Sequence, residues 1–181
     1  MQQLIGQLFG FVAIGVSYFI FQQKNRKRLL VFKLIADLLW VTHFALIGGY
    51  TAMATTGVGV ARELVFLQSG KGFFKSKLWL YLFILAFPAT LLFTYNGLLS
   101  IFPVLSSVIA TVGFWCKKVQ NTKKFALCQS VGMLLYNSFV GSVAGIVNEI
   151  LVLTSIAISH YHNNAYKRGK KGNSYANKKG L

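Results

Sequence analysis

Two stretches of the chain share one order of residues, LLWVTHFALIGG at residues 38–49 and LLYNSFVGSVAG at residues 134–145. Each stretch opens with two leucines and an aromatic residue and ends in a turn of small residues. Each also follows a basic cluster, NRKR at residues 25–28 and NTKK at residues 121–124. The order of helix, basic connection, helix, small-residue turn and helix therefore occurs twice, which predicts an internal three-helix repeat.

The composition indicates a membrane protein. Of the 181 residues, 55% are hydrophobic and only 12% are charged, with a net charge of +16. The basic residues occur in blocks between apolar runs of about 18 residues, which are typical of transmembrane helices, so the positive charge need not indicate nucleic-acid binding. Seven such runs are predicted, at residues 4–22, 29–47, 51–68, 78–95, 98–115, 125–140 and 143–160.

The basic residues also predict how the chain is oriented. The first, third and fifth connections and the tail carry all but two of the 19 Lys and Arg residues, and the other connections carry no charge. Because Lys and Arg are retained on the cytoplasmic side, we expect a periplasmic amino terminus and a cytoplasmic carboxyl terminus. The first residues lack a basic region and a small-residue cleavage site, so no cleavable signal peptide is expected.

The repeat predicts the architecture. A three-helix unit crosses the membrane an odd number of times, so two copies joined directly would be inverted. The run at residues 78–95 has no counterpart and, as a linker helix, restores the same orientation. We therefore expect an all-α membrane protein with seven transmembrane helices in a 3+1+3 arrangement of parallel repeats, the plan of the SWEET sugar transporters. The expected divisions are residues 1–69, 70–97 and 98–160, with a basic disordered cytoplasmic tail at 161–181.

Three blocks and one arginine carry a family resemblance: THFALIGGYTA at residues 42–52, Arg62, PVLSSVIATVGFWCK at residues 103–117, and LLYNSFVGSVAGIVNEI at residues 134–150. With these the chain resembles the YgjV family of bacterial inner-membrane proteins over nearly its full length. The resemblance implies a small multi-pass membrane protein and no particular activity. The 3+1+3 plan is more distantly similar to SWEET and PQ-loop transporters, although the Pro-Gln pair of the latter is missing.

All three acidic residues, Asp37, Glu63 and Glu149, lie inside predicted helices, where a charge costs about 3 kcal/mol. Lys33 and Asp37 are four residues apart and share a helix face, so we predict that they pair. Arg62 and Glu63 are adjacent and point about 100° apart, so we predict that Arg62 pairs with Asp37 instead. Ion pairing inside the membrane is thus expected among Lys33, Asp37, Arg62 and Glu63.

Glu149 has no cation in its own helix before the tail, so we predict that it faces a polar cavity that binds a small polar solute or relays a proton. The residues predicted to line this cavity are His43, Asn137, Asn148 and Glu149, with Trp40 and Tyr136 as repeat-related aromatic walls. The alternative is that these groups form interhelical hydrogen bonds, worth about 0.6 kcal/mol each.

Two classes of function remain open: a SWEET-like or proton-linked carrier of a small polar solute, or a non-transporting protein that regulates or assembles with a partner through its helices or tail.

No enzyme, catalytic residue, metal or cofactor is expected; Cys116 and Cys128 lack metal-ligand spacing. The expected partners are the lipid bilayer, anionic headgroups at the tail and a small solute, but no nucleic acid. The GxxxG pair Gly6 and Gly10 indicates close helix packing, either within the chain or in a homodimer.

Overall fold

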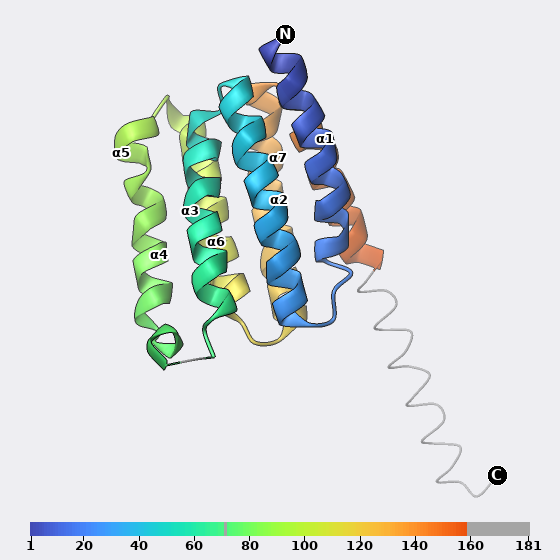
Figure 1. Ribbon diagram of the computed structural model, residues 1–181. Coiled ribbons are helices and arrows are strands. Elements are labelled where there is room, and N and C mark those ends of the chain that lie inside the picture. Colours follow the sequence, from blue (N-terminus) through green and yellow to red (C-terminus); the bar gives the residue numbers. More distant parts are fainter. Residues whose placement is uncertain (71, 159–181) are drawn as a thin grey trace, which may run out of the picture.

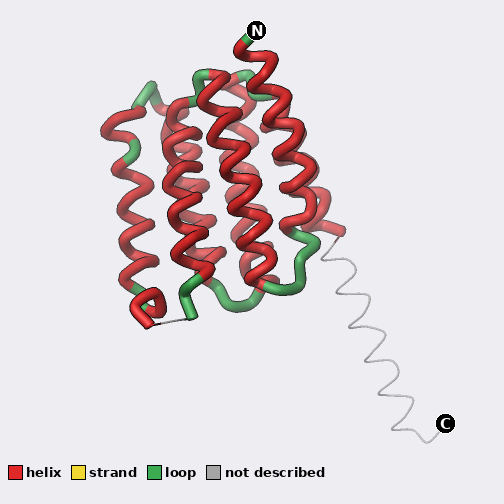
Figure 2. Tube along the Cα trace, in the orientation of Figure 1, coloured by secondary structure: helices red, strands yellow, loops and turns green. Residues whose placement is uncertain are grey.

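The computed structural model describes residues 1–70 and 72–158, so the predicted tail lies outside the described residues. This part of the chain is helical throughout and contains no strand (Figures 1 and 2), as the all-α prediction requires. The elements are α1 (Gln2–Ile20), α2 (Arg26–Ile47), α3 (Tyr50–Leu67), η1 (Gly72–Lys75), α4 (Leu78–Ala89), α5 (Leu91–Thr94), η2 (Leu98–Ser100), α6 (Ile101–Trp115), α7 (Val119–Val140) and an unlabelled helix, Val143–Ile158.

Each of the seven predicted runs contains a helix, but only three helices among the described residues are long and apolar enough to cross a membrane by themselves. These are α1, α2 and the segment Leu98–Trp115. Two further apolar helices, Leu78–Thr94 and Val143–Ile158, are shorter. The helix over the run 78–95 continues through Pro88 and is interrupted at Thr90, whose N–H bonds the Phe87 carbonyl oxygen three residues back at 3.1 Å.

The helices form two rows (Figure 1). In one row α1 packs on α2 and α2 on α3; behind it, α6 packs on α7, and α3 and α4 both contact α6. The helix Val143–Ile158 lies against α1, where the Ala144 N–H donates to Gln7 and the Gln22 amide donates to Ser155 Oγ at 2.8 Å. The two rows thus meet along α1 at one side and α3 at the other.

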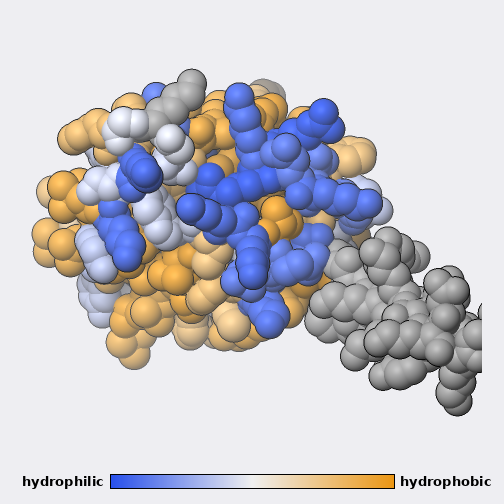
Figure 3. Space-filling model, turned by 90° about the horizontal axis from the view of Figure 1, so that it is seen from below, coloured by the Kyte–Doolittle hydropathy of each residue, from blue (hydrophilic) through white to orange (hydrophobic). Residues whose placement is uncertain are grey.

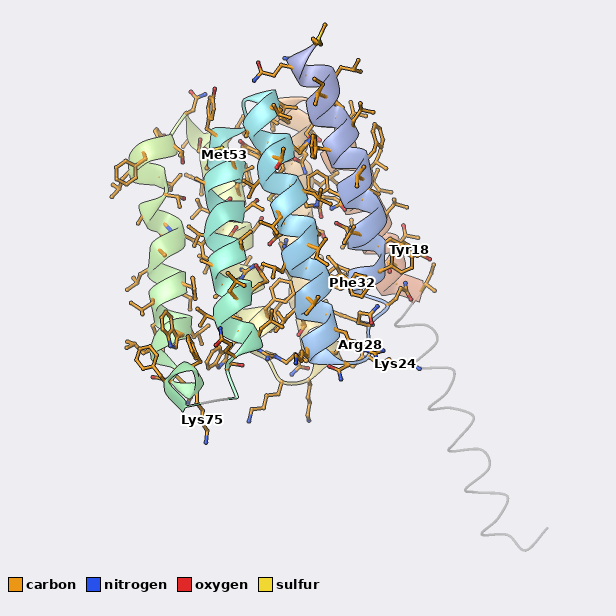
Figure 4. The ribbon with its side chains drawn as sticks, in the orientation of Figure 1. Tyr18, Lys24, Arg28, Phe32, Met53 and Lys75 are labelled. Carbon is orange, nitrogen blue, oxygen red and sulfur yellow. The ribbon has the colours of Figure 1, made fainter. Side chains whose placement is uncertain are left out.

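The connections at the two ends of the bundle differ in charge. The turns from α1 to α2, α3 to α4 and α6 to α7 lie at one end, where Figure 4 labels Lys24, Arg28 and Lys75. Seen from this end, hydrophilic side chains cover the middle of the surface and apolar side chains surround them (Figure 3). At the other end, Gly48 and Gly141 close α2 and α7 with φ values of 81° and 72°, a left-handed conformation that suits glycine.

The surface of the bundle carries many large apolar side chains. Leu8 is 58% exposed, Leu85 69% and Phe93 89%, while Asp37, Arg62 and Glu63 are buried inside. Soluble proteins rarely expose such large apolar patches, and ionisable residues within membrane helices usually face the bundle interior. The distribution therefore suits a lipid environment.

The predicted GxxxG pair packs within the chain. A Cβ atom on Gly10 would lie 2.5 Å from Ala144 Cβ and 2.8 Å from His43 Nδ1, and one on Gly6 would lie 2.9 Å from Ile47 Cγ2. The small residues let α1 approach both α2 and the helix Val143–Ile158 closely. The homodimer consequently gains no support from this motif.

Candidate functional site

A cavity of about 80 Å³ lies between the two rows of helices. Apolar walls come from Trp40, Phe44 and Met133, among others. Its polar lining residues come from α1, α2, α3, α6, α7 and the helix Val143–Ile158: Ser17, Lys33, Asp37, Thr55, Thr56, Arg62, Ser107, Gln129, Ser130, Asn137, Asn148 and Glu149.

The ion pairs at this cavity lie on α2 and α3. Lys33 Nζ pairs with Asp37 one turn along α2. Arg62 donates to its neighbour Glu63, with Nη2 2.7 Å and Nε 3.2 Å from Oε1. The predicted pair between Arg62 and Asp37 is not formed. That prediction was wrong. Neighbouring residues of a helix do point about 100° apart, but the Arg62 side chain is long enough for its guanidinium to contact the Glu63 carboxylate.

The two ion pairs approach one another at Gly59. A Cβ atom there would lie 3.2 Å from Asp37 Oδ2, 3.5 Å from Arg62 Nη2 and 3.7 Å from Glu63 Oε2, so glycine leaves room for these three charged groups. Arg62 also donates to Thr111 Oγ1 at 2.8 Å on α6. These contacts fix the guanidinium between the two rows of helices.

The polar residues on the other side of the cavity, Asn137, Asn148 and Glu149, form no ion pair within the described part of the chain. The Asn148 amide donates to Glu149 Oε1 at 3.0 Å, and the Ser130 hydroxyl also hydrogen-bonds Glu149. Glu149 is only 6% exposed, yet it forms no ion pair with any described residue. The Oδ1 atoms of Asn137 and Asn148 are buried and have no hydrogen-bond partner in the described part of the chain. A buried acceptor left in this way costs about 1–3 kcal/mol, which favours a ligand-binding role.

The predicted site residues separate into three groups. Trp40, Asn137, Asn148 and Glu149 line the cavity together with Lys33, Asp37 and Arg62, and Glu63 lies behind Arg62. His43 is fully buried elsewhere, with Nδ1 2.8 Å from the Gly6 carbonyl oxygen and Nε2 2.8 Å from Ser142 Oγ. Tyr136 lines a second pocket, of about 440 Å³, with Thr51, Thr94 and Phe139.

Several lining residues were not predicted: Ser17, Thr55, Thr56, Ser107, Gln129 and Ser130. Each is a single uncharged polar residue in an apolar helix, and none stands out by charge. A positional signal could have identified some of them, because Thr55 and Thr56 lie 93 residues before Asn148 and Glu149, which line the same cavity.

Among protein-family models, one described as Imp-YgjV, bacterial inner membrane protein, matches residues 4–167. The chain belongs to this family. Comparisons with curated proteins and with solved structures gave no match. The family confirms the predicted resemblance and a location in the bacterial inner membrane, and its description assigns no activity.

Proposed function

We propose that this Imp-YgjV protein is a carrier that moves a small polar solute across the inner membrane, with the central cavity as its binding site. The observation that carries the proposal is that corresponding positions of two like three-helix units line the cavity. In transporters built from repeats, the site lies near the middle of the membrane where the repeats meet.

A uniform shift of 93 residues relates the two units. It takes α2, which spans 22 residues and is closed by Gly48, onto α7, which spans 22 residues and is closed by Gly141. It also takes the start of α3 at Tyr50 onto the start of the next helix at Val143. Of the buried residues of α1, α2, α3 and their ends whose counterparts are described, all but Gly6, Ala36 and Trp40 fall on buried residues.

The same shift of 93 residues relates many of the residues that line the cavity to one another. The lining residues include eight pairs of equivalent positions: Ser17 and Ala110, Ala36 and Gln129, Asp37 and Ser130, Trp40 and Met133, Phe44 and Asn137, Thr55 and Asn148, Thr56 and Glu149, and Gly59 and Val152. A pseudo-two-fold axis along the membrane normal would pass through a cavity lined in this way. This supports the 3+1+3 plan, with α4 as the linker and seven crossings.

The orientation follows from the basic end of the bundle. The three basic connections lie at one end (Figures 1 and 3), and Lys and Arg are retained in the cytoplasm. We propose a cytoplasmic basic end and a periplasmic amino terminus. Reporter fusions after Gly48 and after Ser69 test this, because the first is expected to report the periplasm and the second the cytoplasm; the reverse result would overturn the orientation.

The volume limits the solute. A cavity of about 80 Å³ has room for about two or three water molecules at ~30 Å³ each. The bound solute is therefore small, and its polar groups would meet the carboxylates, amides and hydroxyls of the lining.

Accessibility of the cavity to water-soluble reagents tests the proposal. In a background with Cys116 and Cys128 replaced by serine, Thr56→Cys and Asn148→Cys are expected to react with a small membrane-impermeant thiol reagent. Val12→Cys, on the exposed apolar face of α1, is the matched control and is expected to stay unreacted in the membrane. Protection of both cavity cysteines would contradict a carrier and favour the alternative, a packing protein that assembles with a partner.

A further inference from the structure

The charges around the cavity do not balance. Lys33 and Arg62 are the two cations there, and they pair with Asp37 and Glu63. Glu149 is the third of the chain's three carboxylates and lines the cavity without an ion-pair partner among the described residues. Lys33 is near enough to act on Glu149 electrostatically, but its ammonium group is bonded to Asp37. One negative charge therefore remains buried without a cation beside it, where a lone charge is costly.

The neighbours of Glu149 are oxygen atoms without partners. Asn137 is 1% exposed, and its Oδ1 atom, like Oδ1 of Asn148, is buried and has no hydrogen-bond partner among the described residues. Both residues line the cavity, as does Thr56 of α3. A proton on Glu149 would cancel its charge and could be donated to one of the two amide oxygens, but it would leave the other without a donor. A cation satisfies the carboxylate and the amide oxygens together.

We infer that the cavity binds one monovalent cation, an alkali ion or a small primary ammonium group, at Glu149 with Asn137 and Asn148. Oxygen ligands suit hard cations, and the single uncompensated charge fixes the valence. The cation is then either the solute itself or an ion bound beside it. These two roles of the cation rest on the proposed carrier function, whereas binding of the cation does not require transport.

Thermal unfolding of the purified full chain tests the inference, with tryptophan fluorescence as the signal because Trp40 lines the cavity. Choline chloride is exchanged stepwise for sodium, potassium or methylammonium chloride at constant ionic strength. At least one of the small cations is expected to raise the melting temperature with saturation, because a ligand that binds the folded state stabilises it. No saturable rise with any of them would overturn the inference.

Variants locate the site. Glu149→Gln is expected to abolish the cation-dependent rise, and Asn148→Leu to weaken the apparent affinity at least tenfold. Thr154→Val is the matched control, since Thr154 is an exposed residue of the same helix whose hydroxyl, among the described residues, bonds only the Ile150 carbonyl oxygen; it is expected to retain the full rise. If Glu149→Gln also retained it, the cation would bind elsewhere and the inference would fail.

The melting temperatures in choline show whether each variant folds. Should Glu149→Gln not fold, Thr56→Val, on the facing helix, replaces it and is expected to weaken the affinity for the cation; unchanged affinity would then count against the site. Changes in melting temperature that follow pH but no cation would mean that a proton neutralises Glu149, which would also overturn the inference. A cation-dependent rise combined with protected cavity cysteines would retain the cation site and reject the carrier.

Discussion

The two halves of the bundle differ in how their buried carboxylates are paired. In the first half, Arg62 and Glu63 form a pair, and Lys33 pairs with Asp37. Under the proposed shift of 93 residues, the equivalents of Arg62 and Glu63 in the second half are Ser155 and Ile156, which carry no charge. The buried carboxylate of the second half is that of Glu149, whose equivalent is Thr56. The carboxylates of the first half are thus both paired with cations, which suits a structural role. The carboxylate of Glu149 in the second half has no ion-pair partner among the described residues, which suits binding of a ligand.

The largest effect is expected from breaking the pair at Arg62. Arg62→Met would leave Glu63, which is fully buried, without a cation, and removing one partner of a buried pair costs about 3–5 kcal/mol. The melting temperature in detergent should fall steeply. The double variant Arg62→Met with Glu63→Leu removes both charges and is expected to recover most of the loss. Equal instability of the single and double variants would mean that the charges do not stabilise as a pair.

A second large effect is expected where the halves touch at α1. Gly10→Val would place side-chain atoms where Ala144 and the His43 ring already lie, and overpacking of this kind costs about 3 kcal/mol. The measurement is again the melting temperature. Gly15→Val is the matched control on the same helix, because a Cβ atom there would meet nothing within 4 Å. Similar losses in both variants would show that helix propensity, rather than contact between the halves, decides the result.

The sequence locates the helices well, but its alignment of the repeat differs from the one proposed above. Apolar runs and basic clusters locate a helix in each of the seven predicted runs, and they locate the charged end, because the cost of burying charge in lipid shapes both. The sequence alignment places Trp40 opposite Tyr136, whereas the proposed shift of 93 residues, which follows burial and the glycine caps, pairs Trp40 with Met133 and His43 with Tyr136. Leu-Leu-aromatic sequences recur easily in apolar helices, so matching letters fix a register less firmly than the pattern of burial does.

The charged part of the site was predictable, and the uncharged part was not. A carboxylate such as Glu149 is costly in a membrane helix and so indicates a function. A hydroxyl carries no such signal, because it can bond a carbonyl oxygen of the preceding turn, as Thr55 does with Thr51 at 3.0 Å. For this reason Thr55, Thr56 and Ser130 were found only from the fold.

A direct comparison of a paired and an open carboxylate is expected to give a moderate difference. Asp37→Asn weakens a charged hydrogen bond with Lys33 and should cost about 2 kcal/mol. Glu149→Gln keeps the volume and loses no ion pair, so in choline its melting temperature should stay close to that of the unaltered protein. If Glu149→Gln destabilised the chain as much as Asp37→Asn, the carboxylate would have a structural role and the contrast between the halves would be lost.

The smallest effect is expected at the position equivalent to Arg62. Ser155→Ala removes the acceptor of the Gln22 amide, a half-buried hydrogen bond of 2.8 Å, and one neutral hydrogen bond contributes about 1 kcal/mol. A small fall in melting temperature is therefore expected, well below that of Arg62→Met. Gln22→Leu removes the other partner, so combining it with Ser155→Ala should add little to either single change. If Ser155→Ala lowered the melting temperature as much as Arg62→Met does, the two equivalent positions would contribute similarly to stability. The difference in charge between the halves would then not correspond to a difference in stabilisation.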